Sequence, residues 1–165
     1  MAHEPGTPEP IPPELAAWAG PIAAPTSAEL ADRYAVSQLC KVYALGMDMR
    51  AYALSRSAFA DDAFAEGSVG LAPIDDYLPK VYAGASGFAA TQHNITNQYV
   101  TLDGDTAVVW SYAVAYHWAA PGETRSDLVV GVQYRDQCRR FPEGWLITAR
   151  KVVKQWAQEP AGRKP

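Results

Sequence analysis

Four long segments of strand-forming residues, joined by three short turns, make up the C-terminal half of the chain. The segments cover residues 91–102, 106–119, 127–140 and 145–156, and the turns are Asp103-Gly104-Asp105, Pro121-Gly122-Glu123 and Pro142-Glu143-Gly144. Glycine beside aspartate or proline is typical of tight connections between antiparallel strands. The pattern therefore predicts an antiparallel meander, which limits the fold to one that is built around a single large sheet.

Helical patterns precede these strands. A capping box, Thr26-Ser27-Ala28-Glu29, predicts a helix that runs to about Gly46, with apolar residues near a 3.6-residue period. We expect a second, short helix over residues 51–60, a short strand at 64–66 and a third helix over 73–83, with proline in its first turn. The predicted class is α+β: a cone-shaped α+β barrel, with three N-terminal helices packed on a curved, mainly antiparallel sheet.

The strand segment from Val108 to Tyr116 is apolar at both alternating sets of positions. An antiparallel sheet with one face in water would alternate more clearly, so we expect both faces to be covered. The helices can cover one face, and a second subunit is the expected cover of the other. The predicted assembly is therefore a homo-oligomer, either a dimer or a trimer.

Residues 1–25 are rich in proline, which disfavours helix and central strand, so this segment is expected to be an extended arm. Leu15, Trp18 and Ile22 are more apolar than a linker requires. The arm is therefore expected to lie across its own domain or a neighbouring subunit. The predicted division is an arm at 1–25, a folded domain at 26–157 and a disordered tail at 158–165.

Composition and charge exclude several classes of partner. The formal net charge is −4 and no extended basic run is present, so neither nucleic acid nor an anionic membrane is an expected partner. No membrane span and no signal peptide are recognisable. Cys40 and Cys138 give neither a disulfide framework nor metal-ligand spacing, and are interpreted as reduced thiols of a cytoplasmic protein. No metal or other cofactor is predicted.

Two of the three histidines, His93 and His117, are candidates for proton transfer, because imidazole titrates near working pH. His3 falls in the proline-rich arm, whereas His93 and His117 fall on predicted strands where alternation can turn them toward the same interior. The alternative for each is a core histidine that is satisfied by hydrogen bonds.

Asp48 follows the predicted end of the first helix, between Met47 and Met49. It can be a surface or helix-capping aspartate. Alternatively, it lies at the mouth of the cone and accepts a hydrogen bond from one imidazole nitrogen, which leaves the other nitrogen basic. A carboxylate partner favours the imidazolium that forms when the base takes a proton, and it fixes the tautomer.

Four stretches together resemble the SnoaL-like branch of the nuclear transport factor two-like superfamily, over about residues 27–157: Tyr43–Tyr52, Thr91–His93, Tyr112–His117 and Gly144–Arg150. Within that branch, the site residues are most similar to those of the scytalone dehydratases and lindane dehydrochlorinases. This resemblance implies that His93, paired with Asp48, removes a proton next to a departing group. It also implies that His117 is a second active-site histidine and that Arg150 is an arginine near the leaving group.

The sequence departs from scytalone dehydratase at the residues that polarise the substrate carbonyl. Met47 and a residue near Gly67 replace its two tyrosines, and Val132 and Tyr134 align near its serine and asparagine. An oxyanion partner, if one is needed, must therefore come from elsewhere, and the candidates are Tyr52, Asn97, Tyr112 and Tyr134. Each of these tyrosines can instead be a core residue with its hydroxyl at the rim. Asn97 can instead pair with backbone. The predicted substrate-binding residues are Tyr43, Met47, Tyr52, Asn97, Tyr112 and Tyr134.

The predicted function is a cofactor-independent acid/base lyase, similar to a dehydratase, that acts on a small hydrophobic cyclic molecule of polyketide- or terpenoid-like character. Phe59, Phe64, Trp110 and the methionines are the expected apolar lining. Arg150 either faces solvent or, if it faces inward, is paired with Asp48 or a substrate anion. The alternatives are a polyketide cyclase or isomerase of the same fold, and a non-catalytic small-molecule-binding module.

Overall fold

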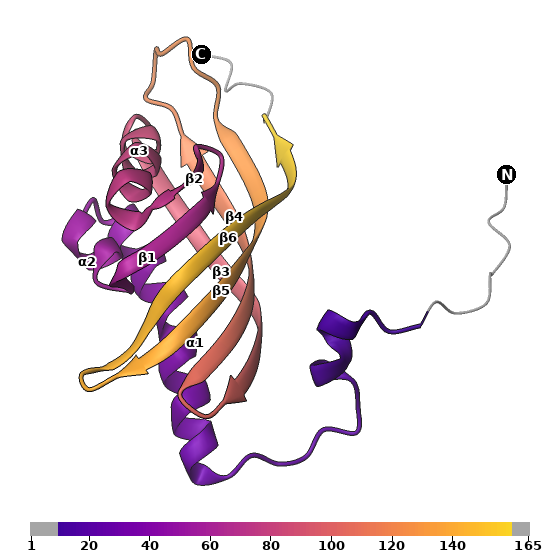
Figure 1. The fold of residues 1–165 in the computed structure, drawn as a ribbon. Coiled ribbons are helices and arrows are strands. Elements are labelled where there is room, and N and C mark those ends of the chain that lie inside the picture. Colours follow the sequence, from indigo (N-terminus) through magenta and orange to yellow (C-terminus); the bar gives the residue numbers. More distant parts are fainter. Residues whose placement is uncertain (1–9, 160–165) are drawn as a thin grey trace, which may run out of the picture.

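The computed structural model describes residues 10–159, so His3 and most of the predicted C-terminal tail lie outside the described residues. Three α-helices, one 3-10 helix and six strands are present in this range (Figure 1). In chain order they are η1 (Pro13–Trp18), α1 (Ser27–Asp48), α2 (Tyr52–Arg56), β1 (Phe59–Gly67), β2 (Gly70–Pro73), α3 (Ile74–Ser86), β3 (Ala90–Asp103), β4 (Thr106–Trp118), β5 (Leu128–Phe141) and β6 (Gly144–Gln158).

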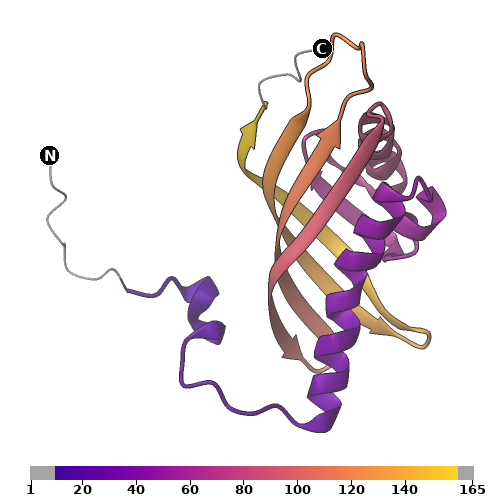
Figure 2. The ribbon, with the colours of Figure 1, turned by 180° about the vertical axis from the view of Figure 1, so that it is seen from behind.

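The six strands form one curved sheet in the order β2-β1-β6-β5-β4-β3. Neighbouring strands are antiparallel, except that β1 pairs with β6 in parallel. The sheet does not close, because β2 and β3 are its two edges. Helix α1 runs along the inner side of the sheet and α3 covers its upper end (Figure 2). The predicted α+β class is confirmed, with an open curved sheet in place of a closed barrel.

The four predicted strands correspond to β3–β6, and the turns between them contain Gly104, Gly122 and Gly144 with positive φ angles of 56°, 85° and 134°. Glycine adopts such angles without steric cost, which explains why these turns can be read from the sequence. β1 is longer than the predicted strand at residues 64–66, and β2 was not predicted.

Helix α1 begins as predicted and ends later. The Thr26 hydroxyl accepts a hydrogen bond from the Glu29 backbone N–H at 3.2 Å, and the Glu29 carboxylate accepts one from the Thr26 backbone N–H at 2.8 Å. Gly46 does not end the helix. A Cβ atom at this position would lie 2.4 Å from the backbone nitrogen of Ser55, so glycine is required here by the close approach of α2.

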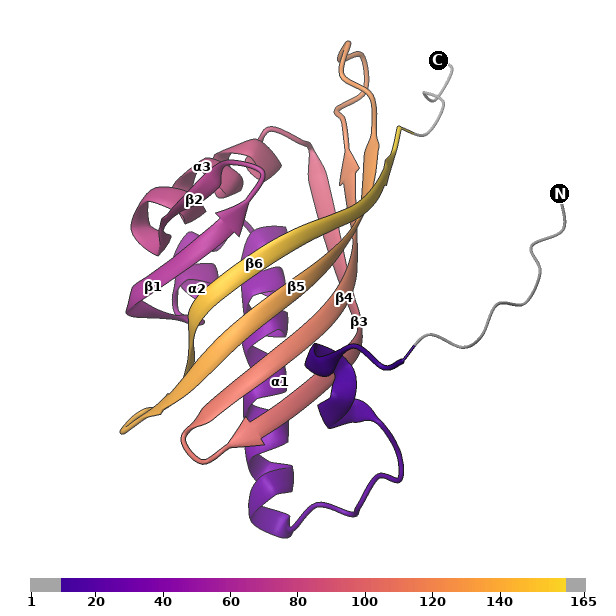
Figure 3. The same cartoon turned by 45° about the vertical axis from the view of Figure 1, so that its right-hand side comes forward.

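The described part of the arm contains the short helix η1, contrary to the prediction of a purely extended segment. This helix lies on the outer side of the sheet (Figure 3). Trp18 at its end packs on the sheet, with its ring centroid 5.1 Å from that of Trp110 and 5.7 Å from that of Tyr99. The arm therefore lies across its own domain. Cys40 and Cys138 are free and buried. Within residues 10–159, no helix has the length and apolar character that a membrane span requires.

Candidate active site

A cavity of about 700 Å³ opens on the inner side of the sheet, between α1, α3 and strands β3–β6. Much of its wall is apolar, from residues that include Val81, Ala85, Phe88, Val130, Val132 and Val152. Hydrogen-bonding side chains reach the same space: Tyr43, Tyr77, His93, His117 and Tyr134, together with Ser68 and the charged residues Glu66, Lys80 and Lys154. An apolar cavity with a few polar groups is typical of a site for a small molecule.

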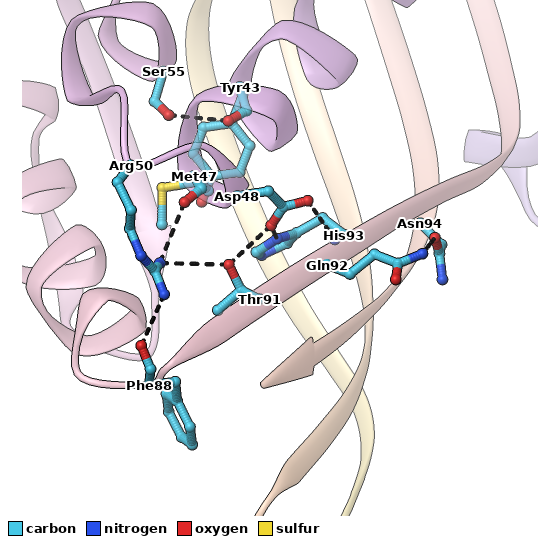
Figure 4. A network of polar contacts seen from close by, with 10 residues as sticks. All are labelled: Tyr43, Met47, Asp48, Arg50, Ser55, Phe88, Thr91, Gln92, His93 and Asn94. Carbon is cyan, nitrogen blue, oxygen red and sulfur yellow. Dashed lines mark hydrogen bonds and ion pairs between the residues drawn. The ribbon is translucent and has the colours of Figure 1, made fainter. Parts of the chain in front are cut away.

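His93 lines the cavity, and its side chain is in direct contact with Asp48 (Figure 4). The His93 Nδ1 lies 2.6 Å from Asp48 Oδ1, and the His93 backbone N–H donates to Asp48 Oδ2 at 2.8 Å. The side chains of His93 and Asp48 are 5% and 20% exposed. The last residue of α1 is thus joined to the start of β3 by two bonds to the same residue. With the proton on Nδ1, the other ring nitrogen is the basic one.

Thr91 bonds to this carboxylate and Arg50 contacts Thr91, and neither was predicted as a site residue. The Thr91 hydroxyl donates to Asp48 Oδ1 at 3.0 Å. Arg50 donates to the Phe88 carbonyl at 2.9 Å, and also reaches the Thr91 hydroxyl at 3.4 Å (Figure 4). Arg50 has a positive φ of 56°, which is uncommon for a residue with a side chain. The turn after α1 is therefore shaped by its contacts with β3.

Asp48 is in its charged form at neutral pH. Burial alone would raise the pKa of its carboxyl, but hydrogen bonds from the His93 side chain and backbone outweigh burial and lower the pKa below its usual value. The charge on Asp48 is consequently available to stabilise a positive charge on the imidazole.

His117 lies beside His93 in the cavity. Their ring centroids are 5.8 Å apart in an edge-to-face arrangement, and the Phe88 ring lies 5.0 Å from His117 on another side. Burial, together with the neighbouring His93, lowers the pKa of His117, so this ring is neutral at neutral pH. Its Nδ1 is buried and has no hydrogen-bond partner among the described residues. His117 therefore presents a neutral ring to the cavity, next to His93.

Arg150 lies beneath the cavity and does not line it. Its Nε and one terminal nitrogen donate to the two carboxylate oxygens of Asp136, each at 2.7 Å, and both side chains are 2% exposed. Its guanidinium also lies 4.5 Å from the centre of the Tyr43 ring and 4.6 Å from that of Tyr134. Arg150 is thus neither solvent-facing nor paired with Asp48. The expectation that it lies near a leaving group has to be corrected, because Asp136 already satisfies its charge.

The predicted substrate-binding residues divide into two groups. Tyr43, Met47 and Tyr134 line the cavity. Tyr52 instead packs edge-to-face on Tyr82, with centroids 5.3 Å apart, and lies outside the cavity lining.

Asn97 and Tyr112 border a depression on the outer face of the sheet, so the prediction that they bind substrate has to be corrected. A register shift in β3 between Ile95 and Gln98 reverses the alternation that His93 would otherwise impose on Asn97. On β4, Tyr112 and His117 are an odd number of residues apart, so their side chains point to opposite faces of the sheet. Of the expected apolar lining, Phe64 and Trp110 also lie elsewhere, around a shallow depression that Arg135 and Lys151 border.

Tyr77 of α3 lines the cavity and was not predicted from the sequence. Its buried neighbours Ile74 and Leu78 recur at helical spacing, and that spacing is the signal that would have placed Tyr77 on the inner face of α3. Within residues 10–159, no group of three or more His, Cys, Asp or Glu side chains is arranged to hold a metal ion.

Sequence comparison and fold comparison agree with this architecture. The SnoaL-like domain model matches residues 28–151. An uncharacterized protein of Mycobacterium tuberculosis is 30% identical over 132 residues, which are 77% of this chain and 88% of that protein.

Two solved structures have the same fold. A scytalone dehydratase-like protein of Novosphingobium aromaticivorans superposes with a TM-score of 0.72 at 20% identity, over 86% of this chain and 100% of that one. A hexachlorocyclohexane dehydrochlorinase of Novosphingobium barchaimii superposes with a TM-score of 0.70 at 17% identity, over 83% and 97%. The family model covers most of the helices and strands described above, and the chain therefore belongs to the SnoaL-like domain family.

Proposed function

We propose that this protein is a cofactor-independent acid/base lyase that removes an activated C–H proton from a small hydrophobic cyclic molecule and expels a leaving group. One observation carries the proposal: the His93 imidazole lies in the wall of an apolar cavity with Nδ1 only 2.6 Å from the Asp48 carboxylate. The described residues give its second ring nitrogen, Nε2, no hydrogen bond, so that atom is available to a substrate.

In the proposed first step, a carbon atom next to a carbonyl group loses its proton to His93. The C–H bond breaks, Nε2 binds the proton, and the electron pair passes into the carbonyl as an enolate. Asp48 then faces an imidazolium, and the attraction between the two charges favours this state. General base catalysis of this kind contributes about 10²–10⁴-fold to a rate.

In the second step, the enolate collapses and the bond to a β-hydroxyl group breaks. The lowered pKa of His117 keeps it neutral, so its role is a hydrogen bond to the departing oxygen. The proton held on His93 passes to that oxygen. Water leaves, a C=C bond remains, and His93 returns to its neutral form.

The volume and lining of the cavity support the proposed substrate class. A volume of about 700 Å³ admits a molecule of one to three rings, and the valines and Phe88 favour an apolar one. Two fold relatives support the proposal of an elimination, since one is described as a scytalone dehydratase and the other is a dehydrochlorinase, and these names denote loss of water and of HCl.

Isomerisation or ring closure is a second candidate, and one observation favours it. A neutral His117 is a weaker acid than the imidazolium of His93 beside it, so the proton on His93 is the more readily returned of the two. Return of the proton to a different carbon would then compete with loss of the leaving group. Both outcomes share the first step and differ in the product.

The test is a set of cyclic hydroxyketones incubated with the protein in D₂O and analysed by mass spectrometry. Elimination lowers the product mass by one water, whereas isomerisation leaves deuterium in a product of otherwise unchanged composition. His93→Ala is expected to reduce the rate about 10²–10⁴-fold. The matched control is Gln92→Ala, because Gln92 precedes His93 on β3 and is exposed.

Two results would contradict the proposal. Turnover by His93→Ala at the rate of the native protein would exclude His93 as the base. Tight binding of the same ketones without deuterium exchange would identify the protein as a binding module.

A further inference from the structure

The proposed abstraction leaves a negative charge on the substrate carbonyl oxygen, and catalysis requires a hydrogen-bond donor at that oxygen. Asp48 and His93 cannot supply it, because both are engaged in taking the proton. The donor has to reach the same cavity, keep its own proton at neutral pH and be free of other partners.

Tyr77 of α3 meets these requirements. Its side chain is buried and lines the cavity that His93 also lines. Its hydroxyl stands against Gly67, where a Cβ atom would lie 2.3 Å from the phenolic oxygen. The hydroxyl thus occupies the space that a side chain on β1 would otherwise fill. Gly67 itself lines the cavity, so this space belongs to the cavity wall.

The hydroxyl of Tyr77 has capacity to donate. No hydrogen bond from it to another described residue is present, and it is not among the buried polar atoms that are cut off from solvent. Burial raises the pKa of Tyr77, so the phenol keeps its proton at neutral pH. A protonated phenol beside an apolar cavity is a donor without a net charge, which an apolar substrate can approach without desolvating an ion.

The other tyrosines of the cavity are held for a different purpose. The rings of Tyr43 and Tyr134 pack on the guanidinium of Arg150 and edge-to-face on each other, with centroids 5.8 Å apart. They cover the buried Arg150–Asp136 ion pair. Tyr77 is absent from that stack and instead approaches β1.

We propose that the Tyr77 hydroxyl is a catalytic hydrogen-bond donor that stabilises the oxyanion formed when His93 removes the substrate proton. The role of Tyr77 in turnover rests on the proposed function. Whether the cavity binds an oxyanion more tightly than a neutral molecule can be measured without any substrate.

The experiment uses 4-nitrophenolate as an oxyanion probe and nitrobenzene as a neutral probe of similar shape, each titrated into the full-length protein. Tyr77→Phe keeps the ring and removes the hydroxyl. It is expected to weaken 4-nitrophenolate binding about 10- to 100-fold, the range for a hydrogen bond to a charged group, and to leave nitrobenzene binding unchanged. Tyr82→Phe is the matched control, because Tyr82 is on the same helix and packs against Tyr52 away from the cavity lining.

A second variant reaches the same hydroxyl from the opposite side. Gly67→Ala would bring a methyl group into the position of the phenolic oxygen and displace it. It is expected to lower the preference for 4-nitrophenolate over nitrobenzene in the same direction as Tyr77→Phe. Thermal unfolding of each variant identifies any loss of fold.

The assignment is overturned if Tyr77→Phe binds 4-nitrophenolate as tightly as the native protein does, or if it loses both probes equally, which would indicate a packing role. Failure of the native protein to prefer the anion would also overturn it. Failure of the proposed function looks different: the Tyr77-dependent preference would persist while no ketone exchanges deuterium. Conversely, His93-dependent exchange that is unaffected in Tyr77→Phe would remove only Tyr77 from the mechanism.

Discussion

The inner and outer faces of the same sheet differ in how they accommodate an arginine, which is buried on the inner face and half-buried on the outer face. On the inner face, Arg150 is enclosed by aromatic rings and holds both oxygens of Asp136 at 2.7 Å. On the outer face, Arg135 lies flat on the Trp110 ring at 4.1 Å and donates to the Gln133 side chain at 2.6 Å. Arg135 and Asp136 are adjacent in β5, and alternation alone sends them to different environments.

The two arginines differ in how strictly their surroundings fix their partners: strictly in the interior, and loosely at the surface. A charge that is removed from water requires a dedicated counter-charge with good geometry, whereas a half-buried one is satisfied by a ring and an amide. The candidate active site lies on the inner face of the sheet, where a displaced side chain has few alternative positions. We therefore expect substitutions on the inner face to have the larger effects.

The largest effect on stability is expected from breaking the inner ion pair. Asp136→Ala leaves Arg150 buried without a counter-charge and should lower the free energy of unfolding by about 3–5 kcal/mol. Arg135→Ala on the outer face should cost about 1 kcal/mol or less. Urea denaturation of both variants measures the two values. Equal losses would mean that the two faces do not differ in the way described.

A smaller effect is expected from acidification, and it originates on the inner face. The pKa of His117 is lowered, so the unfolded chain binds this proton more readily, and stability should decline as the pH falls below the ordinary value of 6.5. The pKa of Asp48 is also lowered, so its stabilising contribution should be lost only as the pH falls below 3.8. Unfolding measured at a series of pH values checks both steps, and His117→Gln should abolish the first. Persistence of that first step in the variant would assign it to another group.

Detaching the arm should have a modest effect that is confined to the outer face. Trp18→Ala removes two aromatic contacts and is expected to cost about 1–3 kcal/mol, since each such pair contributes about 0.5–1.5 kcal/mol. Binding of 4-nitrophenolate in the inner cavity should not change. A loss of probe binding in Trp18→Ala would show that the two faces are coupled.

The smallest effect on the folded chain is expected at the exposed aromatic residues of the outer face. Tyr112 and Trp156 are 40% and 46% exposed. A second subunit is the predicted cover of this face, because the segment from Val108 to Tyr116 is apolar at both alternating sets of positions. Sedimentation analysis should give the mass of a dimer or trimer for the native protein and a lower mass for Trp156→Asp, with little change in probe binding. A monomeric native protein would contradict this prediction.

Much of the fold was predictable because its signals are local. The capping box at Thr26 and the turn glycines of the meander each act within a few residues. The parallel pairing of β1 with β6 was not predictable from the sequence. It joins segments that are far apart in the chain, and the sequence of β1 shows no clear alternation of apolar and polar residues. Gly46 was read as a helix stop because glycine in a sequence does not distinguish a helix end from a close contact with another helix.

The candidate site was predictable where alternation is unbroken. His93 and His117 fall on the inner face as their positions in the strands indicate, whereas the register shift after Ile95 moved Asn97 to the outer face. The partner of Arg150 was missed because Asp136 looks like an ordinary strand residue until the neighbouring strand is placed beside it. Predicting that Tyr77 lines the cavity would have required knowing which face of α3 packs against the sheet.

The position of Asp48 at the end of α1 affects how well the site stabilises a positive charge on His93. Asp48 is the last residue of a 22-residue helix, and aligned peptide dipoles give the C-terminal end of a helix a partial negative charge. The carboxylate and the helix terminus therefore act in the same direction on His93. A cation created on that ring lies at the negative pole of the longest helix among the described residues, so the backbone itself is oriented in advance for the ionic state that proton transfer creates.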